Sequence, residues 1–260
     1  MANRKKTTIV ISIVSHQQGD LAYRLLADIR THCSNRPTAV VLTHNLAEDF
    51  PLPETDWPFK VLQLTNPEPQ GYGANHNQAF RTVSADYFCA LNPDIRLEQD
   101  PFPALLTRLE KDSIIGAISP LVLGPDRRIE DNARRLPTPK RILKRMVKLG
   151  PRRDYDIETI IQPVDWLAGM FLLFPSPIYR QLNGFDERYF LYCEDVDLGC
   201  RLRLAGLVSA LDPTVAAIHE PRRDSHRRPR HLFWHLSSLV RFFRSPVYST
   251  CRRLEGRREI

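Results

Sequence analysis

Three carboxylates lie within four consecutive positions, at Glu194, Asp195 and Asp197, directly behind an aromatic and apolar run. A carboxylate is costly to bury without a partner, so this pattern requires either a partner or a chemical role. Acidic residues in the first turn of a helix interact favourably with the helix dipole, and Glu194 or Asp195 can serve as a cap. The aromatic lead-in at residues 185–190 instead points the helix start into an apolar, partly closed place. There a carboxylate is more useful as a base than as a cap, and we predict a base.

A further acid, Asp94, ends the sequence LNPD at residues 91–94, directly after a short apolar segment. If that segment is a buried strand of a parallel sheet, the carboxylate lies at the carboxyl edge, where open α/β sheets bind ligands. Asn, Pro and Asp also favour turns, so a plain turn is an equal alternative. His219 follows the apolar segment 215–217 and becomes a candidate only if the fold brings it close to Asp94.

The segment QGYGANHN at residues 70–77 is a glycine loop that opens a predicted helix. Backbone N–H groups at such a helix start can face a phosphate. The segment lacks the third glycine of a dinucleotide-binding fingerprint and follows a long loop, so alone it is a weak indication.

The elements that position these residues alternate along the chain. Apolar, β-branched segments predict strands at 8–14, 39–43, 60–64, 86–91, 114–119, 169–174 and 215–217. Helical patterns follow an N-cap at Gly19-Asp20 and cover 77–83, 102–111, 177–182 and 194–205. This alternation predicts an α/β fold with a mostly parallel sheet and helices on both faces.

The composition is that of an ordinary soluble protein of one or two domains, with 260 residues, 42% hydrophobic and 26% charged. The five cysteines form no CxxC pair, which predicts small core residues in a reducing compartment. No apolar run approaches the roughly 18 residues of a membrane span. We therefore expect a cytoplasmic protein without a transmembrane anchor.

Positive charge is concentrated in two places. From residue 222 onward there are eleven Arg and three acidic residues, a net charge of +8, which leaves −1 for the first 221 residues. Residues 134–153 hold nine Lys or Arg and no acid. Basic amphipathic helices are predicted at 140–149 and 231–244, and such helices bind membrane interfaces. The alternative is a solvated face on a helix packed onto the domain.

A nucleic-acid-binding protein is a rival from another class, because phosphate neutralisation by eleven arginines would give salt-dependent binding. The tail lacks a recognition motif and the body is not basic, so we expect no nucleic-acid partner.

Taken together and in order, these segments resemble the family 2 glycosyltransferases, which have the GT-A fold. The motifs are ISIVSH at 11–16, GYGANHN at 71–77, LNPD at 91–94, VDWLAG at 164–169, GFDE at 184–187, YCEDVDL at 192–198, and His219. Within that family they look most like bacterial O-antigen rhamnosyltransferases. Those enzymes move L-rhamnose from dTDP-β-L-rhamnose to N-acetylglucosaminyl-diphospho-undecaprenol.

The resemblance implies a Rossmann-like GT-A catalytic domain in residues 1–220, with a nucleotide-binding half at about 1–120 and an acceptor-binding half at about 121–220. Residues 221–260 would then be a basic, helical C-terminal extension on the inner face of the cell membrane.

The resemblance also implies roles for single residues. Asp94 and His219 are expected to hold Mg²⁺ or Mn²⁺ against the donor diphosphate. Asp195 is expected to be the catalytic base, with Glu194 as the alternative, while Glu194 and Asp197 cap and orient the helix. The expected nucleotide-sugar site comprises Ser15, His16, Asn45, Gly71, Tyr72, Gly73, His76, Asn77, Asn92 and Asp94. The expected acceptor site comprises Asp165, Trp166 and Gly169.

The implied reaction agrees with elementary chemistry. A nucleoside diphosphate leaves with concentrated negative charge, which a divalent cation stabilises. A carboxylate that accepts the proton of the attacking hydroxyl accelerates transfer by roughly 10²–10⁴-fold. A β-linked donor attacked once from the opposite face gives an α product, so we expect inversion.

One departure from the resemblance bears on the donor. Most relatives carry an acid before Asn where this chain has His44-Asn45, and that acid usually helps to bind the nucleotide. A UDP-hexose or UDP-galactofuranose donor therefore stays open beside the dTDP-sugar. An inactive nucleotide-sugar-binding homologue is a further alternative, against which the retained Asp94, Asp195 and His219 argue.

Overall fold

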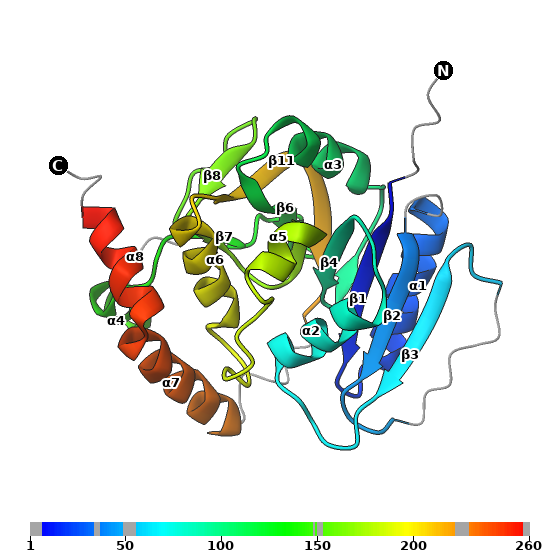
Figure 1. Cartoon of the computed structure of the whole chain (residues 1–260), viewed down its shortest axis with the longest axis horizontal. Coiled ribbons are helices and arrows are strands. Elements are labelled where there is room, and N and C mark those ends of the chain that lie inside the picture. Colours follow the sequence, from blue (N-terminus) through cyan, green and yellow to red (C-terminus); the bar gives the residue numbers. More distant parts are fainter. Residues whose placement is uncertain are drawn as a thin grey trace.

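The structure is a computed structural model that describes residues 7–33, 37–48, 56–147, 149, 153–221 and 229–256. Residues 1–6, Lys148, and residues 222–228 and 257–260 of the basic tail lie outside the described residues. The fold is α/β, built on one large twisted sheet with helices on both faces (Figure 1).

The large sheet has the strand order β3-β2-β1-β4-β10-β6-β11-β5, and β8 pairs with β11. Its main strands are β1 (Ile9–Ser15), β2 (Pro37–His44), β3 (Lys60–Thr65), β4 (Tyr87–Leu91), β6 (Ile115–Leu123), β10 (Phe171–Pro175) and β11 (Val208–His219). The short strands are β5 (Ile95–Arg96) and β8 (Gln162–Val164), while β7 (Ala133–Arg134) and β9 (Trp166–Leu167) form a separate two-stranded sheet. The predicted mostly parallel sheet is confirmed, with β10 inserted antiparallel between β4 and β6.

The strand directions place the carboxyl ends of β1, β2, β4 and β11 at one edge. β1 runs parallel to β2 and β4, β10 is antiparallel to both β4 and β6, and β11 is parallel to β6. Ser15, His44 and His219 end their strands there, and Asp94 follows β4. The sequence motifs therefore converge on this edge of the sheet.

Helices cover both faces of the sheet, and nearly every residue of β1 is buried whichever face it points to. Ile9, Ile11 and Ile13 pack against one face with α1 (Gly19–His32) and α3 (Phe102–Lys111). Val10 packs on the other face with α2 (Tyr72–Thr82), α5 (Ser176–Gln181) and α6 (Glu194–Leu204). A strand whose successive residues are all buried is typical of a parallel sheet covered on both sides.

The C-terminal helices α7 (Pro229–Arg244) and α8 (Pro246–Gly256) pack on α6 through a third apolar cluster. Phe242 of α7 and Cys251 of α8 are buried in it together with Cys200 of α6. A short helix, α4 (Pro139–Met146), is joined to α8 by an ion pair between Arg141 and Glu255 at 3.6 Å. Within the described ranges, no helix combines the length and apolar character needed to span a bilayer.

Several sequence predictions differ from the structure in their bounds or caps. α2 begins at Tyr72 and not at 77. The prediction missed its first turn because that turn holds polar and small residues with no apolar stripe. The N-cap predicted at Gly19-Asp20 is wrong, since α1 has no side-chain cap and the Gly19 N–H donates to Glu48 Oε2 at 2.9 Å. The C-terminal extension is helical as expected, but α8 was not predicted as a separate helix. All five cysteines are buried and free, as expected for small core residues.

The buried pair Ser12 and His76 makes stability depend on pH. Ser12 Oγ is hydrogen-bonded to His76 Nδ1 at 2.8 Å, and burial lowers the pKa of His76 from 6.5 to about 3. Below pH 6.5 the unfolded chain binds a proton at this residue and the folded chain does not. This group therefore lowers the free energy of unfolding by about 1.4 kcal/mol per pH unit as the pH falls from 6.5 to 3.

We expect the His76→Gln variant to show a shallower loss of stability in acid, because glutamine can bond Ser12 but does not titrate. Urea unfolding at several pH values between 4 and 7 measures the slope, a range set by the pKa values above. Equal slopes in the two proteins would contradict the prediction.

Candidate active site

Asp94 and His219, far apart in the sequence, lie side by side at the carboxyl edge of the sheet. His219 Nε2 is 3.3 Å from Asp94 Oδ2, and the Glu220 N–H donates to the Asp94 carbonyl at 2.8 Å. His219 is the last residue of β11 and not a residue beyond its end, and it pairs with Ile95 of β5. This pairing places His219 beside the turn that carries Asp94.

Glu130 completes this group, although no sequence motif indicated it. The His219 Nδ1–H donates to Glu130 Oε2 at 2.7 Å. Burial disfavours the charged imidazole, but the hydrogen bonds and charges of Asp94 and Glu130 prevail and raise the pKa of His219 to about 9. Glu130 lies in the segment between β6 and β7, and only the fold brings it to His219.

The Asp94–His219 pair suits a hard divalent cation. Asp94 Oδ1 is buried and has no hydrogen-bond partner, so it can accept a positive ligand. Among the described residues no group of three or more His, Cys, Asp or Glu side chains forms a metal cage. Mg²⁺ and Mn²⁺ need few protein ligands where phosphate oxygens and water supply the rest. A proton and a cation would compete for Nε2 of His219.

The helix with the acid cluster, α6, starts from a strained turn. Tyr192 and Cys193 have φ angles of 71° and 69°, in the left-handed region that residues other than glycine rarely adopt. The turn is held from α7, because the Ser238 hydroxyl donates to the Leu191 carbonyl at 2.8 Å and the Tyr192 hydroxyl is hydrogen-bonded to His231 Nδ1 at 3.1 Å. The side chain of Cys193 itself is buried.

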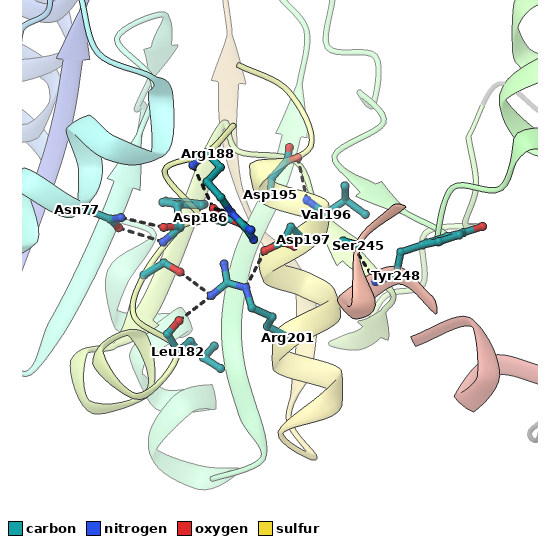
Figure 2. Close-up of polar contacts among 12 residues, drawn as sticks. Asn77, Leu182, Asp186, Arg188, Asp195, Val196, Asp197, Arg201, Ser245 and Tyr248 are labelled. Atoms are coloured by element: carbon teal, nitrogen blue, oxygen red, sulfur yellow. Dashed lines mark hydrogen bonds and ion pairs between the residues drawn. The ribbon is translucent and has the colours of Figure 1, made fainter. Parts of the chain in front are cut away.

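Asp195 lies partly exposed at the start of α6 (Figure 2). Its Oδ1 accepts from its neighbour Val196 N–H at 2.8 Å, and its Oδ2 accepts from Gly169 N–H at 3.1 Å. Burial raises the pKa of Asp195, while these two hydrogen bonds and the charge of Arg134 oppose the rise. A carboxylate that is fixed in place with a raised pKa is suited to accept a proton.

Glu194 and Asp197 do not cap α6, and that expectation is wrong, since the helix has no side-chain cap. Glu194 is buried with Oε2 unpartnered, and burial and the charge of Asp195 raise its pKa. Asp197 pairs with Arg201 at 2.7 Å, and Arg201 donates to the Leu182 carbonyl at 2.6 Å (Figure 2). Asp197 thus orients α6 through Arg201.

The segment at residues 168–170 joins the two acidic sites. The Asn92 N–H donates to the Met170 carbonyl at 3.0 Å, beside the turn that carries Asp94. The preceding residue, Gly169, donates to Asp195 and its carbonyl accepts from the Tyr72 hydroxyl. Asn92 and Asp195 are therefore hydrogen-bonded to adjacent residues.

The glycine loop has a packing role. A Cβ on Gly71 would lie 2.8 Å from the Phe190 carbonyl, and a Cβ on Gly73 would lie 2.5 Å from Phe185 Cβ. The Tyr72 N–H donates to the Phe190 carbonyl at 2.9 Å and is not available to a phosphate. The glycines allow α2 to approach the segment that leads to α6.

His76 and Asn77 are buried residues of α2 that make hydrogen bonds inside the domain. His76 is fully buried against Ser12, and Asn77 Nδ2 donates to the Phe185 carbonyl at 2.8 Å (Figure 2). The Asn77 Oδ1 accepts from the Tyr179 hydroxyl at 2.7 Å. In this conformation neither side chain is exposed to a bound nucleotide.

Ser15, His16 and Asn45 lie together where β1 and β2 end. The Asn45 N–H donates to the Ser15 carbonyl at 2.8 Å, and Asn45 Nδ2 lies 3.2 Å from His16 Nδ1. Asn45 also holds the Gln70 backbone through both side-chain atoms. Ser15 and Asn45 are buried, while His16 is exposed.

The acid that is missing at position 44 is present nearby as Glu48. His44 Nδ1 is 2.7 Å from Glu48 Oε1, and His44 Nε2 is 3.0 Å from Gln63 Oε1. The Glu48 carboxylate therefore lies at this edge of the sheet, although in the sequence it comes four residues after position 44, where most relatives carry the acid.

The expected acceptor residues differ in their surroundings. Asp165 Oδ2 accepts from the Leu136 N–H at 2.7 Å, which gives this carboxylate a structural role. Trp166 is buried, and its Nε1–H donates to the Arg135 carbonyl at 3.0 Å. Gly169 touches Asp195 directly.

Comparison with protein-family models finds no match. A curated N-acetylglucosaminyl-diphospho-decaprenol L-rhamnosyltransferase of Mycobacterium tuberculosis is 31% identical over 252 residues, which cover 88% of this chain and 81% of that protein. The chain belongs to this rhamnosyltransferase family. The rhamnosyltransferase WbbL of Escherichia coli K12 is 29% identical over 90% of this chain and 92% of its own length.

Solved structures with this fold are GT-A glycosyltransferases. GalNAc-T7 with UDP, GalNAc and Mn²⁺ superposes with a TM-score of 0.65 at 15% identity, covering 85% of this chain and 45% of that one. The Pyrobaculum calidifontis mannosyltransferase PcManGT with GDP-Man and Mn²⁺ gives 0.62 at 16%, covering 94% and 67%. The GT-A fold of this glycosyltransferase is thereby confirmed.

The contact between Glu130 and His219 predicts an effect on metal binding by this rhamnosyltransferase homologue. A carboxylate that holds the second nitrogen of a metal-binding histidine fixes the ring and raises its basicity. We expect Glu130→Gln to weaken Mn²⁺ binding roughly tenfold in the presence of a nucleoside diphosphate. The electron paramagnetic resonance signal of free Mn²⁺ measures this directly.

Glu98→Gln is the matched control, because Glu98 pairs with Arg127 on the surface at 2.7 Å. This variant is expected to leave the Mn²⁺ affinity unchanged. An unaltered affinity in Glu130→Gln would show that Glu130 has no part in metal binding.

Proposed function

We propose that this enzyme transfers L-rhamnose from dTDP-β-L-rhamnose to a polyprenyl-diphosphate-linked N-acetylglucosamine, with inversion and with Mg²⁺ or Mn²⁺. The observation that carries the proposal is the 31% identity to the decaprenol-linked L-rhamnosyltransferase along 88% of the chain. The product would belong to O-antigen or cell-surface polysaccharide synthesis.

Asp195 is the proposed base. Its position is fixed by the Gly169 N–H at 3.1 Å and by the start of α6, so the carboxylate needs no rearrangement before it accepts a proton. The acceptor hydroxyl would lose its proton to Asp195 as it attacks the anomeric carbon from the face opposite to the diphosphate. One such displacement inverts the anomeric centre.

Asp94 and His219 are the proposed ligands of the divalent cation, with Glu130 holding the histidine. When bound, the cation neutralises the charge that develops on the leaving diphosphate. The unpartnered Asp94 Oδ1 supports this assignment, since a buried carboxylate oxygen lacks compensation without a cation.

The donor base would lie at the ends of β1 and β2, beside Asn45 and the His44–Glu48 pair. The His44-Asn45 departure keeps a UDP-sugar as the second candidate. The two donors differ in the base and the sugar, while the proposed chemistry is the same.

Melting temperatures tell the donors apart and test the base. We expect dTDP with Mn²⁺ to stabilise the enzyme more than UDP or GDP does, because specific ligands stabilise the folded state by mass action. Asp195→Asn should keep this stabilisation while its rate of transfer falls by about 10²–10⁴-fold.

Asp186→Asn is the control for charge removal nearby, because Asp186 pairs with Arg188 at 2.6 Å in the preceding segment. It is expected to retain transfer. Full transfer by Asp195→Asn would exclude Asp195 as the base.

The exposed face of α7 supports association with a membrane. The helix packs on the domain through Ser238 and Phe242, which leaves Leu232 at 62%, Phe233 at 68% and Leu236 at 53% exposure. α7 is therefore packed onto the domain, as in the alternative interpretation, but its solvated face carries apolar side chains. Exposed apolar groups gathered on one helix are typical of an interaction surface.

Basic residues accompany this apolar face. α4 adds the exposed Leu143 beside Lys140 and Lys144, and the exposed Val147 directly follows this helix. Each Lys or Arg near an anionic lipid surface contributes about 1 kcal/mol to binding. We propose that α7 and α4 hold the enzyme peripherally on the inner face of the cell membrane, where its lipid acceptor would reside.

Flotation with anionic vesicles tests this surface. We expect the protein to bind at low salt and to dissociate as salt rises, because screening weakens attraction between exposed charges. Replacing Phe233 and Leu236 with Ser should reduce binding. Ile114→Ser removes an exposed apolar residue at the other edge of the sheet and should not; equal binding by all variants would contradict the assignment.

A further inference from the structure

Arg134 is held on a rigid aromatic platform next to the proposed base. In the β7–β9 pair Arg134 stands opposite Trp166, and its guanidinium carbon lies 5.3 Å from the centre of the Trp166 ring. Trp166 is fixed in turn, because a Cβ on Gly199 of α6 would lie 2.6 Å from Trp166 Cβ. Gly199 lies one helical turn after Asp195, on the same side of α6.

The terminal nitrogens of Arg134 are left for a ligand. Within the described part of the chain, its recorded polar contacts are made through Nε, which donates to the Asp131 carbonyl at 2.8 Å and lies 3.4 Å from Asp131 Oδ2. That carboxylate is bound more closely by Arg145, at 2.6 Å. The Arg134 side chain is 34% exposed, so its terminal nitrogens are accessible to a solute.

The charge of Arg134 acts on two neighbours. It counters the rise that burial causes in the pKa of Asp195. Partial desolvation lowers the pKa of His235 on α7, and the charge of Arg134 lowers it further. The guanidinium therefore lies within electrostatic range both of the start of α6 and of α7.

The Trp166 ring beneath Arg134 connects the proposed base to α7. Trp166 packs against Gly199 of α6, one turn after Asp195, and it shares an apolar cluster with Phe242 of α7. In a lipid-linked acceptor the reacting sugar is attached directly to a diphosphate, and the diphosphate to the lipid chain. A cation near both the base and α7 suits the middle group of such an acceptor.

We propose that Arg134 binds the diphosphate of the lipid-linked acceptor, an inference that rests on the proposed function. The planar guanidinium can make two parallel hydrogen bonds to phosphate oxygens, which a lysine cannot do. Trp166 and the Asp131 carbonyl fix the orientation of this fork before the acceptor arrives. Binding the diphosphate there would place the attached sugar toward Asp195.

Two synthetic acceptors with the same alkyl chain test the assignment, one with N-acetylglucosamine linked through a diphosphate and one with it linked directly. The ratio of their kcat/KM values measures how strongly the enzyme selects the diphosphate. We expect the wild-type enzyme to favour the diphosphate acceptor at least tenfold and Arg134→Gln to lose most of this preference. Arg134→Lys should fall between them.

Arg135→Gln is the matched control. The Arg135 guanidinium lies 4.8 Å from the centre of the Tyr155 ring and donates to the Asp154 carbonyl at 3.1 Å, away from Asp195. This variant should keep the wild-type preference. Fluorescence titration of the diphosphoryl-alkyl compound, with Trp166 as a reporter beneath the guanidinium, should show weaker binding by Arg134→Gln alone.

The outcomes separate the two proposals. A wild-type enzyme that transfers sugar, with an unchanged preference and unchanged titration in Arg134→Gln, overturns the assignment of Arg134 and leaves the proposed function standing. An equal loss of preference in Arg135→Gln also overturns it. A wild-type enzyme that transfers no sugar to either acceptor overturns the proposed function.

Discussion

The hydrogen bond from the Gly169 N–H to Asp195 Oδ2 is the contact on which the candidate site depends. Gly169 and Met170 immediately precede β10, and Met170 accepts from Asn92 at the end of β4. The antiparallel insertion of β10 between β4 and β6 thus brings one short segment against Asp195 and against Asn92, which lies two residues before Asp94. A chain with a purely parallel sheet would have no strand beginning at this edge, and the turn that carries Asp94 would lose its connection to Asp195.

Much of the fold could be predicted because it follows from local pattern. β1 and β2 are nearly continuous apolar segments, and α3 has both a strong apolar stripe and a clear start. The bounds of α2 could not be predicted, because its first turn is held by long-range contacts with Phe185 and Phe190. α8 is polar on average, and only Val247, Tyr248 and Cys251 supply apolar side chains to its packed side, so its sequence shows little apolar stripe.

The site residues divide in the same way. Asp94 and Asp195 stand in motifs and could be found from sequence. Glu130 stands in none, and Arg134 is only one of nine basic residues in the cluster at 134–153. Their roles depend on strand pairing and on loops that only the folded chain brings together. The glycine loop was interpreted as a phosphate site because small residues at a helix start serve both phosphate binding and close packing. Distances to Phe185 and Phe190 show the second use.

The contact between α7 and the turn at Tyr192 and Cys193 bears on how such enzymes diversify. Ser238 and His231 hold a left-handed backbone that residues other than glycine adopt only under constraint. The C-terminal helices are thus not an interchangeable module, since exchanging them between homologues would also alter the backbone from which Asp195 projects. Tail and acid cluster are expected to change together during evolution.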